Sequence, residues 1–210
     1  MMVLNQSVFE KVRKAGCKIL VVTKYWNEIE TKEILNFCEE NYADIFFGLG
    51  ENRIENLERK RLPREKIHFI GNIQSKKITK IVKHSSTVHS LESLKHAELF
   101  NKTMENQFRG DRLKVFLQIK LDSTKELGIL PEDLDKVLGV VKSFKNLEVV
   151  GISGMGNFSL DGKKEEFLLL KKLRDQYLPM GKISAGTSHD FEIALEQGIC
   201  VVRVGRSIVE

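Results

Sequence analysis

Cysteine and proline are both scarce in this sequence of 210 residues, and each scarcity excludes a class of structure. The three cysteines, Cys17, Cys38 and Cys200, are an odd number without C-x-x-C spacing, so neither a disulfide framework nor a zinc site is indicated. Only three prolines occur, and no linker rich in Gly, Ser or Pro divides the chain. We therefore expect a single domain over residues 1–210 that works in a reducing cytosol without a metal ion.

Long apolar runs are also absent. No stretch approaches the roughly 18 apolar residues of a membrane span, and no apolar run near the N-terminus precedes a small-residue cleavage site. Charged residues make up 30% of the chain and the net charge is +5, but Lys and Arg are interspersed with Glu. This mixture favours a solvated surface over a dedicated binder of nucleic acid or membrane. We expect a cytoplasmic monomer that binds neither.

Short apolar runs alternate regularly with longer segments of helical period. The runs are almost continuously apolar, as expected for parallel strands that are covered on both faces. The strand-like runs cover residues 18–23, 44–48, 67–71, 87–90, 114–120, 147–153, 182–186 and 200–205. The clearest helix candidates cover residues 31–41, 131–144 and 163–178. This rhythm predicts an α/β fold with a compact (β/α)8 barrel, and a doubly wound open sheet is the alternative.

Lys24 ends the first strand-like run, directly after LVVT. In parallel α/β folds the active site lies at the carboxyl ends of the strands, so a cation at this position has two interpretations. It is either a solvated residue that caps the strand, or a nucleophile whose ammonium group is partly desolvated at the barrel mouth. A desolvated lysine is suited to forming a Schiff base with a carbonyl compound.

Two glycine-containing turns follow the last two strand-like runs, in SAGTSHDFEIAL and in RVGRS. Thr187 and Asp190 have the spacing of a capping box in the first stretch. Backbone N–H groups exposed by glycine, together with a helix N-terminus, form an anion cradle. In eight-stranded barrels a phosphate site frequently forms after strands seven and eight, although two ordinary turns would look the same. A phosphate cup here would face Lys24, so an aldehyde that carries a phosphate would fit both.

Polar residues also follow the second and third runs. Glu51 and Asn52 are expected at a helix start, and Asn72, Gln74 and Ser75 follow the third run, which indicates a polar pocket.

The remaining charged segments are interpreted as structural. We expect His68 to be a satisfied core histidine, because it lies inside an apolar strand. The helix over residues 76–83 gathers Lys76, Lys80 and Lys83 on one side, which is typical of a solvated face rather than an RNA-binding patch. The run ERKRLPREK at residues 58–66 is expected to be an exposed loop.

Six ordered motifs between residues 21 and 208 carry a resemblance to one family. They are VVTKYW, GENRIEN, HFIGNIQSKK, the GI of VVGISGM, SAGTSHDFEIAL and VVRVGRS. On these residues the chain resembles the pyridoxal phosphate homeostasis protein family, whose barrel is similar to the N-terminal domain of alanine racemase. The resemblance covers essentially the whole chain. It implies a single TIM barrel of PLP fold type III without a second β-domain.

The resemblance also implies a set of residues that bind pyridoxal 5'-phosphate (PLP). Lys24 would hold PLP as a Schiff base, Arg203 matches the arginine that faces the pyridine nitrogen, and Asn52 would lie beside the ring. The other implied cofactor contacts, centred on the phosphate, are Ser184, Gly186, Ser188, Gly205, Arg206 and Ser207.

Four positions depart from the family pattern. The family usually reads Thr-Lys-Pro after its lysine, whereas Tyr-Trp-Asn follows here at residues 25–27, so a second lysine is missing. Arg206 stands where a threonine is common, and Lys-Ser-Gly after the fifth strand is replaced by Glu-Leu-Gly at residues 126–128. The sequence also stops at Glu210, where the family usually continues with Phe-Gly.

Three functions are weighed on this basis. The first is a carrier that controls free PLP without turnover, with PLP-dependent apo-enzymes as its partners. The second is an amino-acid racemase, which needs an acid or base on each face of the substrate and, in alanine racemase, takes a tyrosine from a second domain. An arginine opposite the pyridine nitrogen also disfavours ring protonation. The third, a phosphate-binding or RNA-associated barrel without a cofactor, leaves Lys24 unexplained. We therefore predict PLP homeostasis and no catalytic residue.

Overall fold

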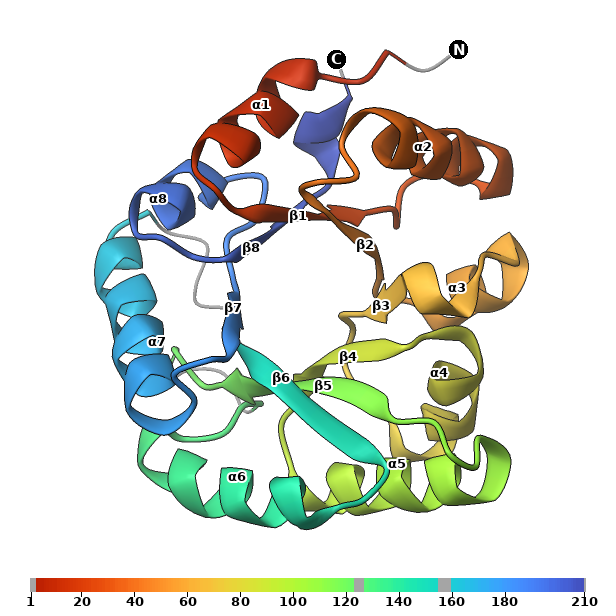
Figure 1. Ribbon diagram of the computed structural model, residues 1–210, viewed down its shortest axis with the longest axis vertical. Coiled ribbons are helices and arrows are strands. Elements are labelled where there is room, and N and C mark those ends of the chain that lie inside the picture. The colour runs from red at the N-terminus through yellow and green to blue at the C-terminus, as the bar shows by residue number, and fades with distance from the viewer. Residues whose placement is uncertain (1–2, 123–126, 155–159, 210) are drawn as a thin grey trace.

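The computed structural model describes residues 3–122, 127–154 and 160–209 as a closed barrel of parallel strands surrounded by helices (Figure 1). The strands follow one another in chain order around the barrel, and β1 (Lys18–Val22) closes it by pairing with β8 (Val201–Val204). This confirms the predicted (β/α)8 barrel and excludes the open sheet.

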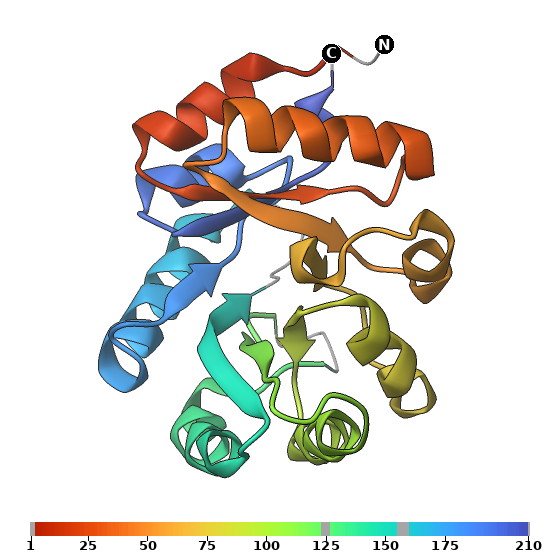
Figure 2. The ribbon, with the colours of Figure 1, turned by 45° about the vertical axis from the view of Figure 1, so that its right-hand side comes forward.

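The remaining strands are β2 (Phe46–Glu51), β3 (Ile67–Phe69), β4 (Thr87–Leu91), β5 (Leu113–Ile119), β6 (Leu147–Gly154) and β7 (Lys182–Ser184). The helices are α1 (Gln6–Lys14), α2 (Glu28–Asn41), α3 (Ile54–Lys60), α4 (Ile78–His84), α5 (Leu94–Gln107), α6 (Leu134–Ser143), α7 (Lys163–Tyr177) and α8 (Phe191–Glu196). Figure 2 shows the same ring of helices around the strands from a second direction.

The apolar strands are buried on both faces, as their composition predicts. Along β1, Ile19 and Val21 belong to the large apolar cluster that the helices cover. Leu20 and Val22 are also buried but lie outside that cluster, because alternate residues of a strand point to the barrel interior. The residues that follow β1 therefore lie at the mouth of the barrel.

The second strand runs further than the sequence predicts, from Phe46 to Glu51 rather than over 44–48. The predicted end fell at Gly48, but this glycine continues the strand and pairs with Leu20 of β1. Its φ is 137°, and a Cβ there would lie 2.7 Å from Nε2 of His68. The glycine is therefore a close-approach position inside the strand.

The loop after β1 ends in a fully formed helix cap. The Asn27 side chain accepts a hydrogen bond from the N–H of Glu30 at 3.0 Å, and the Glu30 carboxylate accepts one from the N–H of Asn27 at 2.8 Å. This capping box starts α2 at Glu28, three residues before the predicted start. It fixes the short segment between Lys24 and the helix.

The two ends of the described chain lie side by side. Leu4 and Val209 form an antiparallel bridge, and the chain ends are adjacent in Figures 1 and 2. All three cysteines are free, as the sequence predicts.

Candidate functional site

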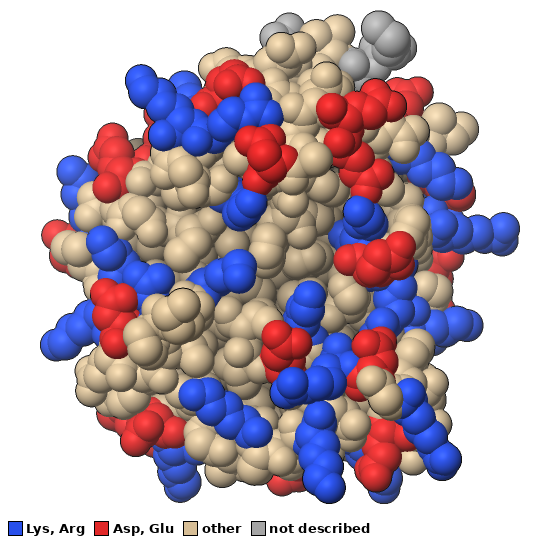
Figure 3. Space-filling view, viewed as in Figure 1, with Lys and Arg blue, Asp and Glu red and all other residues tan. Residues whose placement is uncertain are grey.

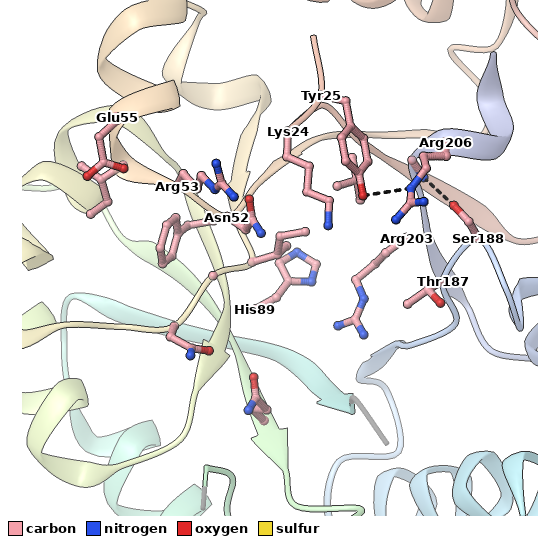
Figure 4. A pocket seen from close by; sticks show the side chains of 18 of the residues that line it. Lys24, Tyr25, Asn52, Arg53, Glu55, His89, Thr187, Ser188, Arg203 and Arg206 are labelled. Carbon is pink, nitrogen blue, oxygen red and sulfur yellow. Dashed lines mark hydrogen bonds between the residues drawn. The ribbon is translucent and has the colours of Figure 1, made fainter. Parts of the chain in front are cut away.

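A cavity of about 530 Å³ opens at the carboxyl ends of the strands. Figure 4 shows side chains from two sides of the barrel converging on it, with Lys24 and Tyr25 between them. On one side lie Thr187, Ser188, Arg203, Gly205 and Arg206, and on the other Asn52, Arg53, Asn72, Gln74 and Gln118. The pocket therefore joins the predicted phosphate cup to the polar residues that follow the second and third strands and to Gln118 within the fifth.

Lys24 lies in this pocket, two residues beyond the end of β1. Its Nζ is 4.9 Å from the centroid of the Tyr25 ring. Lys24 is exposed, which agrees with the solvated one of its two interpretations and not with the desolvated one. The position at the barrel mouth, and not burial, distinguishes this lysine.

Tyr25 contacts both Lys24 and Arg206, two residues that are far apart in the sequence. Its hydroxyl accepts a hydrogen bond from Nε of Arg206 at 3.1 Å, and the guanidinium lies 5.2 Å from the ring centroid. Partial desolvation raises the pKa of Tyr25, but hydrogen bonds and charge from Lys24 and Arg206 lower it by more, so the net pKa falls below 10.0. The sequence analysis noted Tyr25 only as a departure from the family and missed its place in the pocket.

The predicted phosphate cup is formed by two turns that contact each other. The N–H of Gly205 donates to Oγ of Ser188 at 3.1 Å, and Oγ of Ser207 donates to the Ser188 carbonyl at 3.5 Å. The N–H groups of Arg206 and Ser207 have no acceptor within the described residues. The cup thus offers unpaired N–H donors at its mouth, which suits an anion.

Hydrogen bonds to the Asp190 carboxylate stabilise the turn before α8. The Asp190 carboxylate accepts hydrogen bonds from the N–H of Thr187 at 2.6 Å and from its hydroxyl at 2.9 Å, and Nζ of Lys163 lies 3.5 Å from the same carboxylate. Only one half of the predicted capping box forms, because the Thr187 hydroxyl binds the carboxylate and not the N–H of Asp190. At the start of the turn, Gly186 has φ of 82°, a left-handed conformation.

Arg203 reaches the pocket from β8. Its Nη2 donates to the Gly154 carbonyl at 2.8 Å, and no carboxylate lies within ion-pair distance among the described residues. Burial lowers the pKa of Arg203 to about 10, and Asp190 partly opposes this. The guanidinium remains a cation at neutral pH without a counter-charge of its own in the described part of the chain.

A chain of hydrogen bonds runs through the barrel interior and reaches the cavity at His89. Ser184 lies 2.8 Å from Nδ1 of His89, whose Nε2 lies 2.8 Å from Nδ1 of His68. Burial lowers the pKa of His68 to about 3 and that of His89 well below 6.5. Because both rings are neutral and the Phe47 carbonyl accepts from His68, the hydroxyl donates to His89 and His89 donates to His68. His68 is therefore a satisfied core histidine, as predicted.

Ser184 does not line the cavity. Its side chain is fully buried in the barrel interior, where its hydroxyl is hydrogen-bonded to His89. His89 lines the cavity in its place, and the sequence analysis did not single it out. Gly186 and Ser207 also lie outside the lining and belong to the turns behind it. Of the predicted site residues, the structure brings together Lys24, Asn52, Ser188, Arg203, Gly205 and Arg206.

Asn52 carries the clearest unmet polar group. Its Oδ1 is buried and has no hydrogen-bond partner within the described residues. Asn72 and Gln74 line the same side of the cavity, as expected. Ser75 does not, and it lies 3.1 Å from Nε2 of His96.

Glu51 was expected beside Asn52 at a helix start, but it ends β2 and is buried away from the cavity. Lys60, expected in an exposed loop, ends α3, is 1% exposed and pairs with Glu51. Lys60 is buried because its ammonium finds a carboxylate that lies nine residues earlier in the chain. The predictions for Glu51 and for Lys60 are wrong for the same reason, because the burial of each residue depends on the ion pair between them.

The basic helix α4 has carboxylate partners on its neighbour. Lys77 pairs with Glu55 at 3.2 Å and Lys80 with Glu58 at 2.9 Å. Figure 3 shows Lys and Arg mixed with Asp and Glu over the visible face. This agrees with the interpretation of a solvated surface.

In the described ranges, no helix has the length and apolar character to cross a membrane. No group of three or more His, Cys, Asp or Glu side chains that could hold a metal ion occurs in them either.

Comparison with known proteins decides the family. Residues 5–209 match the alanine racemase N-terminal domain. A pyridoxal phosphate homeostasis protein of Deinococcus radiodurans is 32% identical over 164 residues, which cover 77% of each chain. The chain belongs to the pyridoxal phosphate homeostasis protein family.

Other members of the pyridoxal phosphate homeostasis protein family match over a greater length. The Buchnera aphidicola protein of that name is 28% identical over 217 residues, covering 99% of this chain and 93% of its own. Among solved structures, PipY of Synechococcus elongatus, crystallised with PLP bound, superposes with a TM-score of 0.76 at 23% identity. That alignment covers 97% of this chain and all of PipY, and it supports the barrel fold.

Two of the departures from the family pattern cannot be placed. Glu126, in the Glu-Leu-Gly segment, and Glu210, at the end of the sequence, lie outside the described residues.

Proposed function

We propose that this protein binds PLP, holds it on Lys24 and keeps its free concentration in check without turning over a substrate. One observation carries the proposal: a lysine at the end of β1 shares a pocket with a cup of N–H groups and cations at β7 and β8. Relatives that share about 30% of their residues with the chain are named pyridoxal phosphate homeostasis proteins, which supports the same role here.

The residues of the pocket fit this cofactor. The Oδ1 of Asn52 is buried without a partner and can accept a hydrogen bond from a polar ring substituent. The turns around Ser188 and Gly205 suit the phosphate, and Arg203 suits the ring nitrogen, which accepts hydrogen bonds when it is unprotonated. When bound, PLP supplies an aldehyde and an electron-accepting ring.

Lys24 would attach the cofactor. Its amine is the group that would condense with the aldehyde of PLP, with loss of water and without any change of oxidation state. The exposed position of Lys24 leaves this bond open to exchange with other amines, which suits a carrier.

The absence of turnover is part of the proposal. Racemisation needs proton-transfer groups on both faces of the substrate. Tyr25 is the other candidate group near Lys24, but it is the next residue along the chain and its hydroxyl accepts a hydrogen bond from Arg206. Arg203 keeps a positive charge beside the ring nitrogen, which opposes its protonation. These features favour storage over carbanion chemistry.

We also propose that residues 1–210 act as one cytoplasmic, monomeric domain, and that PLP-dependent apo-enzymes receive the cofactor. On the face shown in Figure 3, Lys and Arg are mixed with Asp and Glu, which favours a solvated surface over a nucleic-acid interface.

The visible spectrum of the protein mixed with PLP tests the proposal. We expect a yellow species that borohydride reduction fixes on Lys24, found by peptide mass spectrometry. Lys24→Ala should abolish the covalent link and retain part of the affinity through the phosphate. A protein that stays colourless with excess PLP would overturn the proposal.

A further inference from the structure

A buried ion pair lies directly behind the strand end that carries Lys24. Glu51 is 0% exposed and Lys60 is 1% exposed, and no other ion pair of the described residues is as deeply buried. Burial lowers the pKa of Lys60, and the contact with Glu51 opposes that shift. Neither side chain lines the cavity.

The pair belongs to a network that surrounds one carboxylate. Glu51 accepts hydrogen bonds from Nζ of Lys60, from Oγ1 of Thr23 at 2.8 Å and from Nδ2 of Asn56 at 3.2 Å. Three donors from two segments of the chain, the end of the first strand and helix α3, therefore surround this carboxylate.

The same donors hold the main chain on both sides of the Lys24 α-carbon. Nζ of Lys60 donates to the Thr23 carbonyl at 2.5 Å, and Nδ2 of Asn56 approaches the Lys24 carbonyl at 3.4 Å. The β1 ladder ends at Val22, but the N–H of Thr23 still donates to the Gly50 carbonyl of β2 at 3.0 Å, and the Thr23 carbonyl also accepts from the N–H of Trp26 at 3.1 Å. The buried network adds side-chain donors to this turn at the end of the strand.

Stability alone does not account for this arrangement. Removing two charges from water costs several kcal/mol for each ion, and a buried pair is often replaced by apolar side chains without loss of stability. An apolar pair could fill the space, but it could neither donate to the Thr23 carbonyl, as Lys60 does, nor accept from the Asn56 amide that approaches the Lys24 carbonyl, as Glu51 does.

We propose that Glu51, Lys60 and Asn56 are positioning residues that fix the backbone of Lys24, so that its amine meets the carbonyl carbon of PLP held in the cup. This inference rests on the proposed function. A displacement of about 1 Å at a reacting group can slow a reaction by about a hundredfold, so loss of the network should slow attachment much more than binding.

The test compares two ligands in an apolar replacement of the pair, Glu51→Met together with Lys60→Leu. PLP reports covalent attachment through its absorbance, and pyridoxine 5'-phosphate, which has the same ring and phosphate but no aldehyde, reports binding alone. We expect the double variant to attach PLP about tenfold more slowly or worse. Its affinity for pyridoxine 5'-phosphate should stay within about twofold, and its melting temperature should stay close to that of the wild type.

Two further variants make the result specific. Asn56→Ala keeps the ion pair and removes the contact to the Lys24 carbonyl, so it should slow attachment by a smaller factor. Lys80→Met with Glu58→Gln removes an exposed ion pair of α3 and α4 and should change neither measurement.

An unchanged attachment rate in the folded double variant would overturn the inference, and so would an equal loss for both ligands. If the double variant does not fold, Asn56→Ala decides: an unchanged attachment rate in this variant overturns the inference. Failure of the proposed function looks different, because the wild-type protein itself would then not attach PLP.

Discussion

Nε of Arg206 donates a hydrogen bond to the hydroxyl of Tyr25 across 3.1 Å, joining two residues that are 181 positions apart. Both residues depart from the family pattern, and they meet at the edge of the same pocket (Figure 4). The contact places a guanidinium above the phosphate cup and a phenol beside Lys24. The two departures therefore form one local arrangement.

Arg206→Ala should weaken PLP binding by about 1.5 to 3 kcal/mol, the range for a hydrogen bond to a charged group. The loss should shrink with added salt, because the guanidinium is exposed, and should be absent for pyridoxal, which has no phosphate. Tyr25→Phe keeps the ring but removes the acceptor that orients the guanidinium, so it should cause a smaller loss. Fluorescence titration with PLP and pyridoxal measures both. Equal weakening of the two ligands would show that Arg206 does not contact the phosphate.

Gly186→Ala should destabilise the turn that carries Ser188. A non-glycine residue at φ of 82° costs about 1–2 kcal/mol, and the added Cβ would lie 2.6 Å from the Cβ of Ala194. We expect a lower melting temperature and weaker PLP binding, measured by calorimetry and titration. Gly139→Ala in α6 is the matched control, because nothing lies within 4 Å of its added Cβ. Unchanged stability of Gly186→Ala would contradict the left-handed turn.

The buried histidines should make the protein less stable in mild acid. His68 has a pKa of about 3 when folded and about 6.5 when unfolded, so between these values only the unfolded chain takes up the proton. The free energy of unfolding should fall by about 1.4 kcal/mol for each pH unit below 6.5 for this residue, and His89 adds in the same direction. Urea unfolding between pH 7.5 and 5.5 measures the slope.

The variants His68→Gln and His89→Gln should each flatten that slope. Gly139→Ala, which changes no titratable group, is the control and should leave the slope unchanged. A stability that does not vary over this pH range would contradict the buried, neutral state of the two rings.

Racemase turnover should be negligible. Acid and base steps each contribute about a hundredfold or more to such reactions, and the titratable side chain in contact with Lys24, that of Tyr25, is the next residue along the chain and is held by Arg206. Incubation of the PLP-loaded protein with L-alanine and a wider amino-acid panel, followed by chiral chromatography, measures it. Sustained turnover of about one per second or faster would refute the non-catalytic assignment.

The barrel could be predicted because its signal is local. Continuous apolar runs and their spacing are properties of short windows, and seven of the eight predicted strands begin within one residue of the observed ones. The exception, β2, begins two residues late and runs past Gly48, whose missing side chain makes room for His68 on the next strand. Lys24 and the two turns of the cup could be predicted because strand ends and glycines are also recognised within short stretches of sequence.

The rest of the site depends on contacts between distant segments. Lys60 lies in a charged run that is typical of a solvated loop, and only its contacts with Glu51 and with Thr23, 37 residues away, explain its burial. The place of His89 in the site could not be predicted for the same reason, because its partner Ser184 is 95 residues away in the sequence. No short window of the sequence contains both Lys60 and Thr23, or both His89 and Ser184.

Closure of the barrel between β1 and β8 has a consequence for the order of synthesis. Lys24 follows the first strand, whereas Arg203, Gly205 and Arg206 are translated only after the other seven strands, and the bridge between Leu4 and Val209 forms later still. A nascent chain that lacks β8 presents the lysine without the cup and leaves one edge of the first strand unpaired, since β2 covers only the other edge. The pocket that joins Lys24 to the cup therefore exists only once the eighth strand has been translated and has closed the barrel.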